Sequence, residues 1–160
     1  MRPRTALLLA VVAVFVVAVY AGSFLLFSTN DRVDQLDTQP VREVAAPACT
    51  DLRLAVDALP PLPSGASPAD RLARVEQQRA LVERFIARVE QAGDAALSAD
   101  EPARSWLADW QTLVDSRERW VRDATGPYAV PVEDGQPITR RMNAIGVDAC
   151  TVPVGLTSPS

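Results

Sequence analysis

Residues 5–27 contain no charged side chain, and Arg2 and Arg4 precede them. As an α-helix, this run would be roughly 34 Å long at 1.5 Å per residue, enough to cross a hydrocarbon core about 30 Å thick. A helix satisfies its own backbone hydrogen bonds, which allows a single segment to cross lipid. The sequence therefore predicts one N-terminal transmembrane helix over residues 5–27.

The charges on either side of this run predict its direction. Both flanking residues on the N-terminal side are arginines, whereas residues 30–37 carry three aspartates and one arginine. Basic residues stay on the cytoplasmic side, so residues 1–4 are expected in the cytoplasm and everything after residue 27 outside. A signal peptide cleaved at Ala21, giving a secreted form, is the alternative. The apolar residues 22–27 favour an uncleaved signal anchor.

Composition excludes several classes of function. All 16 basic residues are arginines and two of them precede the run, so the part after residue 27 has 14 Arg against 20 Asp and Glu. Such an acidic domain has no electrostatic attraction for nucleic acid. The chain has no histidine, the commonest general base and metal ligand. It also lacks the nucleophile elbow, the phosphate loop and the dinucleotide fingerprint. We expect no enzyme activity, no metal site and no cofactor.

Cys49 and Cys150 are the two cysteines of the chain. They bracket nearly all the predicted helices after the apolar run, and they would lie outside the membrane, where disulfides form and persist. A redox-active pair is the alternative, but such cysteines usually lie close together in sequence, as in C-x-x-C. A metal site would need more ligands than these two. The sequence therefore predicts a Cys49–Cys150 disulfide.

Proline positions and apolar periodicity divide the rest of the chain. Residues 28–48 are polar with two prolines and are expected to be a tether, and residues 151–160 a flexible tail. Between them, residues 49–150 are expected to form an extracytoplasmic helical domain. Helices are expected over residues 50–59, from Ser67 to the glycine at position 93, over about 100–124, and over a short segment that turns Ile138, Met142 and Ile145 inward. The resulting fold class is all-α: one transmembrane helix followed by a small helical bundle closed by a disulfide.

One face of the helix predicted near residues 100–124 contains the side chains best suited to a binding site. Trp106, Trp110 and Trp120 lie near one face, and Arg117 lies on that face as well. Tryptophans of this kind could line a groove for a sugar or a peptide, and an arginine could bind a carboxylate. The alternative is a bundle core in which the indoles are buried and the arginine stem packs on them.

The segment from Trp106 to Arg117, together with residues 138–150, resembles uncharacterised single-pass envelope proteins of actinobacteria. The resemblance implies the topology and the disulfide, and it implies no activity. From the sequence we expect an interaction or accessory protein of the cell envelope, integral to the membrane and possessing a protein partner there. A small-ligand binding domain that uses the Trp/Arg face is the second expectation.

Overall fold

The computed structural model of this chain describes residues 35–123 and 126–158. The predicted cytoplasmic N-terminus and transmembrane helix, residues 1–27, lie outside the described residues. Within the described ranges, no helix is both long enough and apolar enough to cross a membrane. These ranges are mostly helical, and a disulfide joins Cys49 to Cys150 with 4.9 Å between their Cα atoms. The helical fold class and the disulfide are thus confirmed for the described part of the chain.

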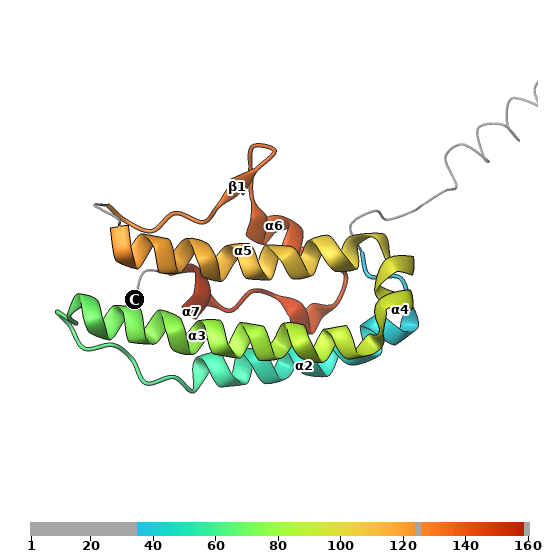
Figure 1. The fold of residues 1–160 in the computed structure, drawn as a ribbon, viewed down its shortest axis with the longest axis horizontal. Helices are drawn as coiled ribbons and strands as arrows, with labels where there is room; N and C mark the ends of the chain where they lie inside the picture. The colour runs from blue at the N-terminus through green and yellow to red at the C-terminus, as the bar shows by residue number, and fades with distance from the viewer. Residues whose placement is uncertain (1–34, 124–125, 159–160) are drawn as a thin grey trace, which may run out of the picture. The chain divides into compact units, whose positions relative to one another are not determined.

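Three long helices form the body of the domain (Figure 1): α2 (Gln39–Asp57), α3 (Pro68–Val89) and α5 (Glu101–Asp123). α3 packs against both α2 and α5, and these are the two most extensive contacts between elements. The disulfide joins α2 to the short helix η2 (Asp148–Cys150). The disulfide therefore links the first long helix to the C-terminal part of the domain. The apolar core lies between the three long helices.

α2 begins well before the predicted start of the helical domain. The expectation that residues 28–48 form a tether was wrong for residues 39–48, which are the first part of α2. Pro40 lies in the first turn, where its missing N–H is not needed, and Pro47 is accommodated inside the helix. Four side chains before Cys49 are buried: Leu36, Val41, Ala45 and Ala48. Burial of this apolar face outweighs the cost of the internal proline.

Asp100 fixes the start of α2 from a distant part of the sequence. Its Oδ2 accepts hydrogen bonds from the Asp37 N–H (3.1 Å), the Thr38 N–H (2.9 Å) and the Thr38 hydroxyl (2.7 Å). The Leu36 N–H donates to the carbonyl of Ile145 at 3.0 Å. Three backbone donors just before the helix are thus satisfied by residues far along the chain, which sequence periodicity does not reveal.

α3 begins as predicted. The Ser67 side chain accepts from the Asp70 N–H while Asp70 accepts from the Ser67 N–H, which forms a capping box with Pro68 in the first turn. Four side chains form a buried apolar stripe along α3: Val75, Val82, Phe85 and Val89. The 3₁₀ helix η1 (Glu90–Ala92) follows, then Gly93 with φ of 90° and the short helix α4 (Asp94–Ala99), which was not predicted.

A short β-hairpin interrupts the all-helical pattern after α5. β1 (Val132–Glu133) pairs antiparallel with β2 (Gln136–Pro137), and Asp134 and Gly135 both have positive φ in the turn between them. The expectation of a fold without strands was wrong here. Figure 1 shows this hairpin projecting from the body of the domain beside α6 (Ile138–Asn143).

The segments after the hairpin close the core. Ile138, Met142 and Ile145 are all buried, as the short-helix prediction required. Beyond Cys150, the expectation of a loose tail was wrong for residues 151–158. This part contains the short helix α7 (Val154–Thr157), and its Leu156 side chain is fully buried.

Candidate functional site

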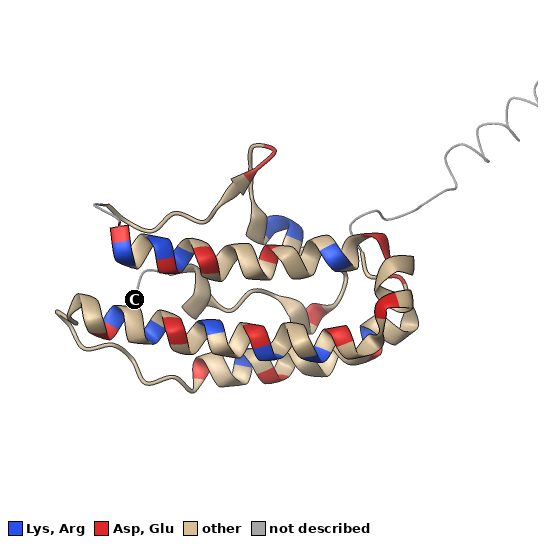
Figure 2. Ribbon diagram, viewed as in Figure 1, with Lys and Arg blue, Asp and Glu red and all other residues tan. Residues whose placement is uncertain are grey.

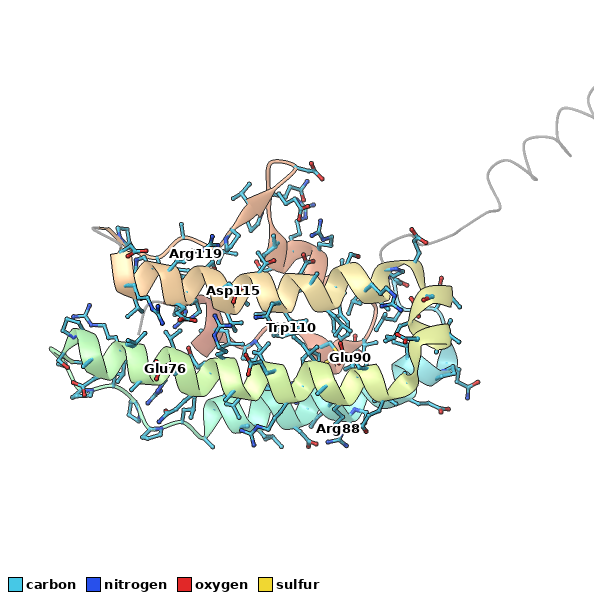
Figure 3. The ribbon with its side chains drawn as sticks, in the orientation of Figure 1. Glu76, Arg88, Glu90, Trp110, Asp115 and Arg119 are labelled. Atoms are coloured by element: carbon cyan, nitrogen blue, oxygen red, sulfur yellow. A yellow bond between two sulfur atoms is a disulfide. The ribbon has the colours of Figure 1, made fainter. Side chains whose placement is uncertain are left out.

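The first two tryptophans of the predicted face lie inside the bundle. Trp106 and Trp110 each expose about 1% of their surface. Both pack on Phe85 of α3, with ring centroids 5.6 Å and 5.0 Å from the phenyl ring. Figure 3 shows Trp110 directed from α5 into the space between α5 and α3. For these two residues the core interpretation is confirmed, and an exposed ligand face is excluded.

Trp120 has a different environment near the end of α5. It is half-buried, its indole N–H donates to the carbonyl of Gly126 at 2.7 Å, and its ring meets Tyr128 edge-on at 5.6 Å. These contacts hold Gly126 and Tyr128, which follow α5, against the end of that helix. The indole donor already has a backbone acceptor, which makes Trp120 a structural residue at the end of the bundle.

Arg117 is buried, with about 1% of its surface exposed. Its Nη1 donates to the carbonyls of Leu156 (3.0 Å) and Ser158 (2.9 Å), and its guanidinium carbon lies 5.2 Å from the centre of the Tyr128 ring. No ion pair with a carboxylate forms at Arg117 within the described residues. Burial lowers the pKa of this guanidinium. Arg117 therefore binds protein backbone in place of a carboxylate ligand.

The backbone that Arg117 binds belongs to residues 152–158, which we call the C-terminal strap. Gln78 of α3 is 2% exposed, and its Nε2 donates to the carbonyl of Gly155 at 2.9 Å. The Val152 N–H donates to Oδ1 of Asn143 at 2.8 Å. Gln78 was not among the residues predicted to form a site. The available signal was its place in the apolar stripe of α3, between Val75 and Val82.

Gly155 allows the strap to lie close to α2. A Cβ atom built on Gly155 would lie 3.0 Å from Cγ1 of Val56, which is too close for an ordinary contact. Leu156 follows directly and is fully buried. The surface that the strap covers, formed by Val56, Gln78 and Arg117, therefore favours glycine followed by a buried aliphatic side chain.

The charged side chains of α3 and α5 form a network. Within each helix, Arg79 pairs with Glu83 and Arg122 with Glu118. Glu118 also pairs with Arg79 across the two helices, and its side chain is 19% exposed. Asp115 accepts from Arg79 at 2.6 Å. Figure 2 shows acidic and basic residues interspersed along these helices.

Two of the surface hollows elsewhere in the described part of the chain lie beside α3. One, of about 690 Å³, lies over α3, α4 and α5 beside Ile86, Leu97 and Leu107. The other, of about 210 Å³, lies between α2 and α3. Trp106, Trp110, Arg117 and Trp120 line neither of them. Within the described residues, no group of three or more His, Cys, Asp or Glu side chains is placed to bind a metal ion.

Comparison of the chain with models of protein families, with curated proteins and with solved structures finds no match. The resemblance to single-pass actinobacterial envelope proteins therefore remains a prediction from the sequence.

Proposed function

We propose that this chain is a membrane-anchored, extracytoplasmic interaction protein of the cell envelope. The observation that carries the proposal is the Cys49–Cys150 disulfide, which closes the domain that follows the apolar run of residues 5–27. Disulfides persist in oxidising compartments outside the cytoplasm. A long apolar run with arginines on its N-terminal side would deliver the domain to that compartment and keep it at the membrane.

A role in protein contacts is supported by how the polar and apolar groups are distributed. The residues that suggested a small-ligand site, Trp106, Trp110 and Arg117, are buried among protein groups. Among residues 35–123 and 126–158, three large aliphatic side chains are instead exposed: Leu54 (60%), Val132 (64%) and Val154 (73%). Single exposed aliphatic side chains are common on folded domains, so these three serve as the positions at which contact with a partner protein is tested.

The test is photo-crosslinking in the native membrane. A photoreactive amino acid would replace Leu54, Val132 or Val154 in the full-length chain, and Glu76, an exposed position on α3 (Figure 3), would serve as the control position. We expect at least one aliphatic position to give a discrete product of constant mass in the membrane fraction. The Glu76 probe should give little or none of it.

A variant lacking residues 1–27 is the matched control for anchoring. In the proposed role, it leaves the membrane fraction and loses the crosslinked product. If all three aliphatic positions gave the same pattern as Glu76, or if the full-length chain were washed from membranes by salt, the proposed role would be rejected.

A further inference from the structure

The C-terminal strap lies outside the loop that the Cys49–Cys150 disulfide closes. It can therefore leave the bundle without breaking a covalent bond. Its own backbone hydrogen bonds are local, from Leu156 to Pro153 and from Ser158 to Val154. No backbone–backbone hydrogen bond joins residues 152–158 to the other described parts of the chain.

The strap is bound as a peptide ligand would be bound. Side chains from three helices contact its backbone: Asn143 accepts from one N–H, Gln78 donates to one carbonyl, and Arg117 donates to two. One side chain, Leu156, is fully buried, whereas Val154 points outward. Contacts to backbone groups give affinity, and a pocket for one side chain gives selectivity.

The C-terminal strap has no carboxylate that could pair with the Arg117 guanidinium. A buried guanidinium normally pairs with a carboxylate, because hydrogen bonds between ionised groups are the stronger ones. Here the acceptors at 3.0 Å and 2.9 Å are the neutral carbonyls of Leu156 and Ser158. The chain continues past Ser158, so the strap presents a carbonyl there. A peptide that ended at this position would present a terminal carboxylate to Arg117.

We propose that the surface formed by Val56, Gln78 and Arg117 is a binding site for the free C-terminus of a partner protein, and that the C-terminal strap covers it in the resting chain. The proposal rests on the interaction role proposed above. The partner sequence it fits has glycine against Val56, an aliphatic residue next, and its carboxylate two residues later. Partner binding would displace the strap and expose it for further contacts.

The test uses the full-length chain in detergent with a protease site inserted at Thr151, which is exposed and precedes the strap. The site is cut after oxidative folding, and the released fragment is removed by size exclusion. Binding of a labelled peptide with the sequence of residues 152–158 is then measured by fluorescence anisotropy. One peptide has a free C-terminal acid and its matched control has a C-terminal amide.

We expect the acid peptide to bind about tenfold more tightly than the amide, because an ion pair with a carboxylate replaces a hydrogen bond from the guanidinium to a neutral carbonyl. A peptide with Gly155→Val should not bind, because the added side chain meets Val56. Arg117→Gln in the protein should remove the preference for the acid. The uncut chain should bind more weakly than the cut chain, because its own strap competes.

Equal affinities for acid and amide on the unsubstituted protein would overturn the proposed site. So would failure of both peptides to bind, or retention of the cut strap through size exclusion. Each of these results leaves the envelope role standing, since that role is tested by crosslinking at Leu54, Val132 and Val154.

Discussion

Trp110→Ala should lower the free energy of unfolding by ~3–5 kcal/mol, through the lost burial of the indole and the cavity left behind. Trp110 is about 1% exposed and packs on both Phe85 and Trp106, so removing it opens the contact between α5 and α3. A domain of this size is stabilised by roughly 5–15 kcal/mol in total. The measurement is urea unfolding of the full-length chain in detergent, followed by circular dichroism.

Thr112→Ala is the matched control for this substitution. Thr112 lies two residues further along α5 and is exposed, so its truncation should change stability by less than about 0.5 kcal/mol. If Trp110→Ala unfolded at the same urea concentration as Thr112→Ala, the indole would contribute nothing to folding. The core position assigned to Trp110 would then be rejected.

Replacing both Cys49 and Cys150 by alanine should destabilise the domain by a similar amount. The two residues are 101 positions apart. In the chain-entropy model, crosslinking a loop of about 100 residues removes unfolded-state entropy worth ~4.7 kcal/mol. The expected result is a marked fall in the midpoint of urea unfolding, and unfolding without added denaturant if the remaining stability is small.

Reduction of the unsubstituted protein provides the control. A membrane-permeant reductant should bring its unfolding midpoint to that of the double-alanine variant, and it should leave the variant itself unchanged. Equal midpoints for the oxidised protein and the variant would mean that the bond between α2 and η2 does not stabilise the fold.

The helix boundaries and core positions that depend on local sequence could be predicted. The Ser67–Asp70 capping box and the inward residues Ile138, Met142 and Ile145 follow from spacing within one turn or two, and the structure has them where expected. The cysteine pair was predictable for a different reason. Two cysteines around a domain that is expected outside the cytoplasm leave few alternatives to a disulfide.

The elements that the sequence did not reveal depend on long-range contacts. Residues 39–48 contain an internal proline and are helical because their apolar side packs into the core, with Asp100 satisfying the backbone donors at the helix start. The strap is bound through its backbone carbonyls by Gln78 and Arg117. Contacts to backbone groups leave no apolar periodicity in the sequence. In a sequence, a buried Gln or Arg cannot be told from a solvated one. Only the folded chain shows which carbonyls accept their hydrogen bonds.

Thiol trapping in intact cells tests most directly whether this domain is anchored on the oxidising side of the membrane. Cells are quenched with acid, and free thiols are alkylated before and after reduction, with the mass of the protein as the readout. For the full-length chain in the membrane fraction, Cys49 and Cys150 should be alkylated only after reduction. In the variant lacking residues 1–27, both cysteines should be alkylated at once, because that variant stays in the cytoplasm. Free thiols in the full-length, membrane-bound protein would contradict the proposed location and the role inferred from it.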